Sequence, residues 1–533
     1  MRASESAGGT FRRRRSFLGL LLALVGGPVL AGCATDPPSG RERSRSPVTP
    51  LRVVTPYVVK SLDPLEQGLW APEWGYGELL MRPTEEGTVE PWVLARLDRT
   101  SDTTWELGLR PGVRFHNGRP LDVNALAGML RRQLRDKPAA AAALPSATVA
   151  ITGPRTVTVT TLVPTPNLPH LLADEGLFAV FDPEAARRAG SDPDELLVAG
   201  LYTGPFRVAA LRPDALTLER NPDYWGGQVT LPGVEIRFVP DASARVLAVR
   251  NDEADLAFYP PTEALRTLRG DQAVRRDSPR ATSQLRAFLA VTTPPLDELS
   301  VRRALALGID YRQLSDDVLD GLYRAPTGMY PGSMPYAVDT VRTDPAEAER
   351  LLDRAGWRKG ADGVRVKDGQ ENRERLRLVV LSYSSQPDTE TIATAMQAQL
   401  ERIGFEIEVR DVAANYDAMA EPGWHVGLSF DGSLGYTFDP IDPLRTFLHS
   451  EGTYNFGKVR DPDLDARIEE LARTFDQATR DRLLREIQRI VARGVHTLFL
   501  AERPARVVAG RAYRGYRPSS VLLHVDRTTG PTG

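Results

Sequence analysis

Hydrophobic and polar residues alternate along several short stretches of the chain in the manner of β-strands. The β-branched run Leu51–Val59 (LRVVTPYVV) and the stretches 156–164 (TVTVTTLVP) and 375–383 (RLRLVVLSY) predict strands. Residues 103–115 alternate like a hairpin, and the Asn-Gly pair at 117–118 supplies a turn that tolerates positive φ. Strands are therefore expected from one end of the globular part to the other.

Leucine and alanine recur at helical spacing in residues 301–319 and 343–357, and Asp344, just before a proline, is suited to cap the second of these helices. Asp122 is the expected N-cap of another amphipathic helix. Residues 391–412 read as a helix, a glycine stop and a strand, which is half of a βαβ unit. Strands that alternate with helices predict mixed α/β lobes.

The longest apolar run, Phe17–Ala31, follows the arginines Arg12–Arg15 and is interrupted by glycine and proline. At about fifteen residues it is too short to span a bilayer, since a spanning helix needs roughly twenty. We therefore expect residues 1–32 to be an export signal. Leu30–Cys33 (LAGC) resembles a bacterial lipobox, in which the cysteine is diacylated and becomes the first mature residue. The alternative is a plain secretory signal followed by an incidental Cys33.

Lipidation would hold the protein at the extracytoplasmic face of the membrane. Residues 14–18 (RRSFL) resemble a twin-arginine export motif, but Arg13 and Gly19 depart from it, so the twin-arginine and general export routes both stay open. Residues 34–50 are rich in Pro, Ser and Arg and have no apolar period, which predicts a flexible tether. The sequence thus predicts a lipidated cysteine and tether at 33–50, followed by a large globular part.

Composition and motifs argue against several functions. Cys33 is the only cysteine, so no intramolecular disulfide can form, and a net charge of −3 with no basic block beyond the leader and tether is a poor basis for nucleic-acid binding. The six histidines form no HxH or HExxH pair, and no GxSxG motif occurs. Gly452–Val459 (GTYNFGKV) nearly fits a P-loop, but it ends in Val where magnesium binding needs Ser or Thr. Nothing in the sequence argues for an enzyme, a metal site or a cofactor.

Five segments occur in an order that resembles a known family: WELGLRPGVRFHNGRPLDVNAL, YTGPFRV…LERNPDYWGG, VRRALALGIDYRQL, TDPAEAERLLDRAGW and YNFGKVRDPDLDARIEEL. They are similar to the successive signatures of the family-5 extracytoplasmic solute-binding proteins, which feed peptide and nickel ABC importers. The likeness covers about residues 50–505. Most of these residues set turns or fill a core, so they indicate the family and leave the ligand open.

The resemblance implies an α/β fold of the periplasmic-binding-protein type: a two-lobed clamshell of type II, of the large class with an extra subdomain in lobe one. By the signatures, lobe one comprises residues 51–83, 200–286 and the return 502–533, the inserted subdomain comprises 84–199, and lobe two comprises 287–501. The hinge strands fall near SQLRAFLAV and HTLFLAERP. A ligand would contact both lobes only when they close.

The resemblance also suggests which residues line the cleft. In lobe one these are Trp74 and Tyr76, for which ordinary core packing is the alternative. In lobe two they lie in the stretch 430–447 and include Tyr436, Phe438 and Asp439. Arg131, on the helix of the inserted subdomain, is a further candidate that would clamp a carboxylate; its alternative is a solvated helix face.

The stretch 433–440 (SLGYTFDP) bears on the ligand. Peptide-binding members commonly carry W-x-G-D-x-x-D-P, whose first Asp pairs with the α-ammonium of the peptide. Here Leu434 replaces the Trp and Tyr436 replaces that Asp, which puts free-amine recognition in doubt unless Asp431 or Asp442 takes its place. The nickel branch also has an aromatic before Asp-Pro and a histidine downstream, but the spacing of His449 does not match it.

The sequence as a whole predicts a monomeric, lipid-anchored receptor that delivers a peptide-like or other small polar ligand to ABC permease subunits with cytoplasmic ATPases. A receptor for a nickel or other metal chelate is the alternative within this class. An extracellular hydrolase or a signalling receptor on the same scaffold is the alternative from another class. On this hypothesis, amine-blocked or aromatic ligands bind better than free di- and tripeptides, because a neutral phenol cannot pair with an ammonium group.

Overall fold

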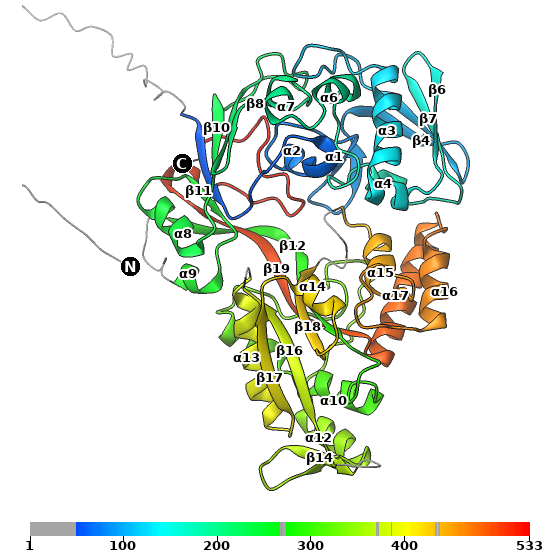
Figure 1. Cartoon of the computed structure of the whole chain (residues 1–533), viewed down its shortest axis with the longest axis vertical. Helices are drawn as coiled ribbons and strands as arrows, with labels where there is room; N and C mark the ends of the chain where they lie inside the picture. The colour runs from blue at the N-terminus through cyan, green and yellow to red at the C-terminus, as the bar shows by residue number, and fades with distance from the viewer. Residues whose placement is uncertain are drawn as a thin grey trace, which may run out of the picture. The chain divides into compact units, whose positions relative to one another are not determined.

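The computed structural model describes residues 49–266, 268, 273–368, 373–384, 386–431, 434 and 437–532 (Figure 1). The export signal, Cys33, most of the tether and Tyr436 lie outside the described residues. Within the described part, no helix is both long enough and apolar enough to cross a membrane.

A ten-stranded sheet runs through the described chain. Strand β1 pairs in parallel with β10 and β11, and β16 pairs in parallel with β17 and β18, whereas the other neighbours are antiparallel. The order across the sheet is β17 (Glu406–Val412), β16 (Arg377–Tyr383), β18 (Val426–Asp431), β12 (Val274–Leu289), β19 (Thr497–Ala509), β11 (Leu256–Phe258), β1 (Leu51–Thr55), β10 (Gly233–Phe238), β9 (Ala215–Arg220) and β8 (Phe206–Arg212).

The two longest strands, β12 and β19, join two lobes of this sheet (Figure 1). One end of β12 pairs with β18, and the far end of β19 pairs with β11. Between Asp277 and Ser283 the pairing of β12 with β19 is irregular. We call the side that holds β1 and β8–β11 lobe one, and the side that holds β16–β18 lobe two.

Each lobe carries its own helices. Lobe one adds a four-stranded sheet in the order β4 (Leu94–Arg99), β5 (Thr104–Leu109), β7 (Thr156–Thr160) and β6 (Thr148–Gly153), and a two-stranded sheet of β2 (Met81–Pro83) and β3 (Val89–Pro91). Its helices are α1 (Pro64–Gln67), α2 (Trp70–Glu73), α3 (Val123–Asp136), α4 (Pro138–Ala143), α5 (Leu168–Leu171), α6 (Pro183–Ala189), α7 (Pro193–Val198), α8 (Ala242–Arg250) and α9 (Thr262–Arg266). Lobe two contains α10 (Leu299–Gly308), α11 (Tyr311–Gln313), a π-turn (Leu314–Val318), α12 (Pro345–Arg354), α13 (Asp388–Glu401), α14 (Asn415–Ala420), α15 (Ile441–Phe447), α16 (Pro462–Leu471), α17 (Gln477–Gly494) and the small strands β13 (Arg358–Lys359), β14 (Arg365–Asp368) and β15 (Arg373–Arg375). A 3₁₀ turn at Arg511–Tyr513 follows β19.

The local predictions agree with these elements. Asp122 caps α3 by accepting a hydrogen bond from the amide of Ala125 at 2.9 Å, and Asp344 caps α12 through the amide of Glu347 at the same distance. Both caps are confirmed. The strand expected at 51–59 ends at Thr55, since the following Pro56 has no amide hydrogen to donate to a neighbouring strand.

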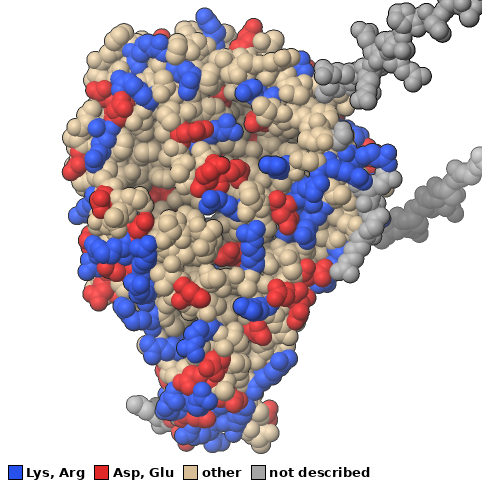
Figure 2. All heavy atoms as spheres, turned by 180° about the vertical axis from the view of Figure 1, so that it is seen from behind, with Lys and Arg blue, Asp and Glu red and all other residues tan. Residues whose placement is uncertain are grey.

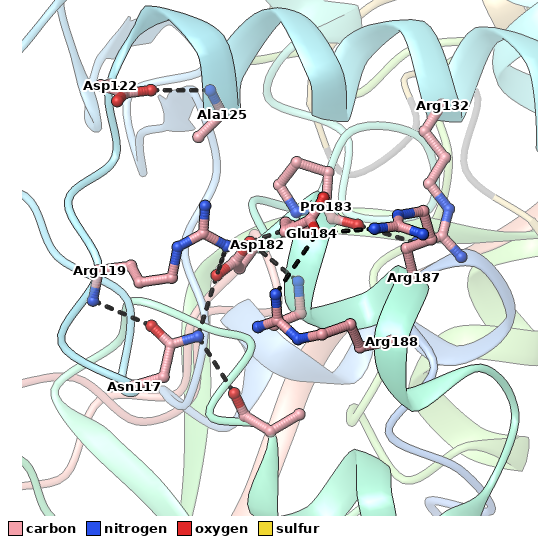
Figure 3. Close-up of polar contacts among 12 residues, drawn as sticks. Asn117, Arg119, Asp122, Ala125, Arg132, Asp182, Pro183, Glu184, Arg187 and Arg188 are labelled. Atoms are coloured by element: carbon pink, nitrogen blue, oxygen red, sulfur yellow. Dashed lines mark hydrogen bonds and ion pairs between the residues drawn. The ribbon is translucent and has the colours of Figure 1, made fainter.

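The Asn-Gly turn at 117–118 is confirmed and is tied to a helix cap (Figure 3). Gly118 has a φ of 82°, and the chain folds back so that the amide of Phe115 donates to the carbonyl of Arg119 at 2.9 Å. The hairpin expected up to Phe115 is interrupted, because β5 ends at Leu109, just before Arg-Pro-Gly.

Asp182, which has no exposed surface, caps α6 through the amides of Glu184 and Ala185 at 3.0 and 3.1 Å (Figure 3). The same carboxylate accepts from Asn117 Nδ2 at 2.9 Å and from Arg119 Nη1 at 2.8 Å. Asp182 therefore ties the turn at 117–118 to the start of α6.

The core consists of several hydrophobic clusters. One fills lobe one, a second lies against the sheet and helices α10, α12 and α13 and also takes in residues of α8, α9 and β11 from lobe one, and a third packs α15, α16 and α17. On the face drawn in Figure 2, basic and acidic side chains are interspersed. Many of them pair across short distances in lobe two, such as Arg375 with Glu406 at 2.6 Å.

Candidate ligand-binding site

A cavity of about 230 Å³ lies between the two lobes. Lobe one supplies most of its wall, from the segments beside α2, β2 and α5 and from the C-terminal return, and lobe two supplies Thr437, just before α15. The described lining residues are Leu69, Leu79, Pro83, Ala173, Asp174, Glu175, Gly176, Thr437, Val521 and Leu523. We call this space the interlobe cavity.

Two polar contacts hold the lobes together beside this cavity. The Nδ1 atom of His170 donates to the carbonyl of Thr437 at 2.8 Å. The side-chain amide of Asn167 donates to Asp439 Oδ2 at 2.7 Å, and both of these side chains are buried. The second contact joins residues 272 positions apart in the chain.

A third contact between the lobes lies at the four-stranded sheet of lobe one. Phe475, in the turn between α16 and α17, packs against Trp105 of β5, with the ring centroids 6.2 Å apart. The guanidinium of Arg99 lies 3.9 Å from the centroid of the Phe475 ring. The lobes of this structure are therefore in contact both beside the interlobe cavity and at the four-stranded sheet, as in a closed clamshell.

The cavity is acidic. Asp174 and Glu175 are the only charged side chains in its described lining, and both are half-buried. Burial, together with the nearby Asp442, raises the pKa of Asp174 to about 6. Burial also raises the pKa of Glu175 well above its usual range, with Glu73 and Asp174 adding to the effect.

Trp74 and Tyr76 lie in the core of lobe one. Trp74 is 1% exposed and packs edge-on against Phe258, and Tyr76 is fully buried and packs edge-on against Tyr202. Neither residue is part of the described lining of the interlobe cavity. Both side chains are therefore part of the hydrophobic core, which was the alternative to a position in the cleft wall.

Arg131 is also placed away from the cavity. It lies on α3, and its guanidinium donates to the carbonyl of Val149 through Nε at 3.1 Å and Nη2 at 2.7 Å. The side chain thus binds the backbone of β6 within lobe one.

Phe438 and Asp439 lie next to Thr437 and are both buried. Phe438 has a φ of 59°, and its ring faces Gly87 of lobe one, where an added Cβ would lie 3.4 Å from the ring. Asp439 accepts from the amide of Ile441 at 3.1 Å in addition to Asn167. Both residues thus contact the opposite lobe directly; Tyr436 lies outside the described residues.

Four residues of the site were not predicted: Asp174 and Glu175 in the cavity wall, and Asn167 and His170 at the contacts between lobes. The signal for the first two is an acidic pair in an otherwise apolar stretch, LLADEGLF. Such a pair is usually read as a solvated turn, so only the tertiary structure shows that it borders a cavity. In the described part of the chain, no group of three or more His, Cys, Asp or Glu side chains is arranged to hold a metal ion.

The chain resembles known solute-binding proteins over nearly its whole length. The nickel-binding protein NikA of Staphylococcus aureus is 23% identical over 514 residues, which cover 94% of this chain and 96% of that protein. The crystal structure of NikA from Brucella suis in complex with Fe(III)-EDTA superposes with a TM-score of 0.80 at 21% identity, over 90% of this chain and 99% of the other. The structure of the oligopeptide-binding protein AppA of Bacillus subtilis with a nonapeptide superposes with a TM-score of 0.72 at 17% identity, over 91% and 100%.

These likenesses confirm the expected α/β clamshell of the periplasmic-binding-protein type. The family model for bacterial extracellular solute-binding proteins, family 5, matches residues 88–455. Proteins of this kind are receptors of ABC transporters rather than enzymes. The chain therefore belongs to family 5 of the bacterial extracellular solute-binding proteins, as its signature segments indicated.

Proposed function

We propose that this receptor is anchored by a lipid on Cys33, captures a small polar solute in the interlobe cavity and delivers it to an ABC permease. The observation that carries the proposal is the cavity itself, whose described lining comes from lobe one together with Thr437 of lobe two. A ligand that contacts both lobes stabilises the closed form, and a permease can distinguish that form from the open one.

The hinge of this movement would be the pair β12 and β19, which joins the lobes where their pairing is irregular. On this view lobe one comprises residues 51–83, 200–286 and 502–533, with 84–199 inserted, and lobe two comprises 287–501. The third contact between lobes then joins the inserted subdomain to lobe two, because Trp105 belongs to the former and Phe475 to the latter.

The size of the cavity favours a small ligand. Its volume of about 230 Å³ is below the roughly 300–1,000 Å³ typical of sites for drug-sized molecules. A di- or tripeptide-like molecule or another small polar solute is therefore favoured over a long peptide. The relationship to nickel-binding NikA supports a metal chelate as the second candidate.

Mass spectrometry of whatever co-purifies with the native protein tests the ligand proposal. Titration calorimetry on the protein without residues 1–33 would follow, with a dipeptide, its N-acetylated form and a nickel–histidine chelate. Binding of a small solute with closure of the lobes supports the receptor function. Binding of the chelate alone would favour the second candidate, and the absence of any retained or bound solute would contradict both.

The lipid anchor has its own test. Cys33→Ala removes the only thiol, so metabolic labelling with a palmitate analogue should mark the wild-type protein and leave the variant unlabelled. The variant should accumulate as an uncleaved precursor or be shed from the membrane. Equal labelling of the two proteins would rule out acylation at this residue.

A further inference from the structure

The two carboxylates of the interlobe cavity have few partners within the protein. The amide of Gly176 donates to Asp174 Oδ1 at 2.8 Å. Among the described residues, Glu175 has no hydrogen-bond partner, and neither carboxylate forms an ion pair with a Lys, Arg or His. The remaining lining is apolar except for Thr437.

Two further carboxyl groups act on this pair. Asp442, in the first turn of α15, acts on Asp174 from lobe two, and Glu73 acts on Glu175 from α2. Lys137, at the end of α3, is the cation that acts on Asp174 and it opposes part of this effect. Carboxyl groups therefore outnumber cationic groups around this end of the cavity.

Glu73 extends the acidic region into the core of lobe one. Its side chain is 1% exposed, and its Oε1 atom has no hydrogen-bond partner among the described residues. The nearest base is His524, whose Nε2 lies 3.5 Å from that oxygen. Burial lowers the pKa of His524 to about 3, so at neutral pH its ring is uncharged and does not balance the carboxylate.

We infer that the ligand carries a positively charged ammonium or guanidinium group, which Asp174 and Glu175 bind in the interlobe cavity. This inference rests on the proposed function and narrows its ligand class. Removing a carboxylate from water is costly unless a partner compensates it, and a cationic ligand would supply that partner. An anionic group in the same place would add a like charge and would be repelled.

Recognition of an amine would then take place in lobe one, and not in lobe two as the family resemblance implies. That resemblance implies an amine-binding Asp at the sequence position of Tyr436, in the stretch 430–447 expected to belong to lobe two. In this chain a cation would instead meet an acidic pair on lobe one, while Leu69, Leu79 and Leu523 offer apolar surface to an aliphatic part of the ligand. Free amines are then favoured, against the expectation for amine-blocked ligands drawn from Tyr436.

Isothermal titration calorimetry of the mature chain tests this inference, with probes that are similar in size and differ in charge. The probes with a cationic group are putrescine, agmatine and the zwitterion alanyl-alanine. Their counterparts without that group are 1,4-butanediol for the two amines and N-acetyl-alanyl-alanine for the dipeptide, and NiCl₂ alone is the metal probe. We expect at least one cationic probe to bind at least about tenfold more tightly than its counterpart, because only the charged group pairs with the carboxylates. Glu175→Gln and Asp174→Asn should each weaken that binding by at least about tenfold.

Glu195→Gln is the matched control, because Glu195 is an exposed carboxylate on α7 outside the described lining of the cavity. It should leave the affinity unchanged, and equal melting curves would show that the three variants fold alike. Affinity should also rise as the pH passes about 6 and above, since Asp174, whose pKa is raised to about 6, and Glu175, whose pKa is also raised, must lose their protons to pair with a cation. Titration near that pH should release protons into the buffer.

The outcomes separate this inference from the proposed function. Three results would overturn the cationic ligand and leave the receptor function standing. The first is equal binding of the neutral counterparts, and the second is binding of nickel without any organic cation. The third is a co-purified neutral ligand whose binding does not change in Glu175→Gln and Asp174→Asn. Failure of all three cationic probes would overturn the cationic ligand as well. The receptor function itself fails only if no solute of any charge is retained or bound.

Discussion

At the scale of one residue, Glu73 is an acidic side chain that the fold buries away from water. Burial raises the pKa of its carboxyl well above the usual range, so the folded protein binds this proton more tightly than the unfolded chain does. Such a group contributes stability that is fully present below the pKa of the unfolded chain, and this contribution is lost as the pH rises through the higher pKa of the folded state.

We therefore predict that Glu73→Gln stabilises the protein at about pH 8 by roughly 1–3 kcal/mol, the scale for a buried unpaired polar group, and by less at about pH 5. The amide cannot ionise, so the pH-dependent loss of stability disappears with the carboxyl. Urea unfolding at the two pH values measures the effect, with Glu195→Gln as the control that should show none. A uniform loss of stability at both values would mean instead that Glu73 forms a favourable ion pair with His524.

At the scale of elements, Asp182 connects a turn to a helix. It caps α6 and accepts hydrogen bonds from Asn117 and Arg119, so one buried carboxylate fixes two segments that are more than sixty residues apart (Figure 3). We predict that Asp182→Ala lowers the free energy of unfolding by about 2 kcal/mol or more, since it removes a cap and leaves buried donors without an acceptor.

Differential scanning calorimetry and hydrogen exchange check this prediction. Faster exchange should be confined to α6 and residues 115–119. The comparison is Asp192→Ala, which removes the cap of the neighbouring helix α7 but no contact to the turn, because the described partners of the Asp192 carboxylate are the amides of Asp194 and Glu195. Equal losses in the two variants would show that the link to the turn contributes nothing.

The elements also show which information a single sequence carries. The caps at Asp122 and Asp344 and the turn at 117–118 could be predicted because each depends on residues within four positions of one another. The two-lobed fold was reached through the family signatures. The acidic wall at 174–175 and the pairing of Asn167 with Asp439 could not be predicted, since they depend on which distant segments meet, and periodicity does not report that.

At the scale of the whole molecule, ligand affinity depends on how often the lobes close. If only part of the population is closed, the apparent dissociation constant rises in proportion, even when no residue in the cavity has changed. Phe475 is suited to test this, because it contacts Arg99 and Trp105 of the opposite lobe and is not part of the described lining of the cavity.

We predict that Phe475→Ala weakens ligand binding by about three- to tenfold, the effect of losing one aromatic contact of this kind. Small-angle scattering should show a larger radius of gyration for the ligand-free variant, and the loss should appear as faster ligand dissociation, because the closed form would reopen more readily. Tyr454→Ala is the matched control: its described ring contacts are with Tyr416, Phe447 and Phe456, all within lobe two. If Phe475→Ala left both the radius of gyration and the affinity unchanged, this contact would not contribute to closure, and closure would have to rest on other contacts between the lobes, such as those of Asn167 and His170.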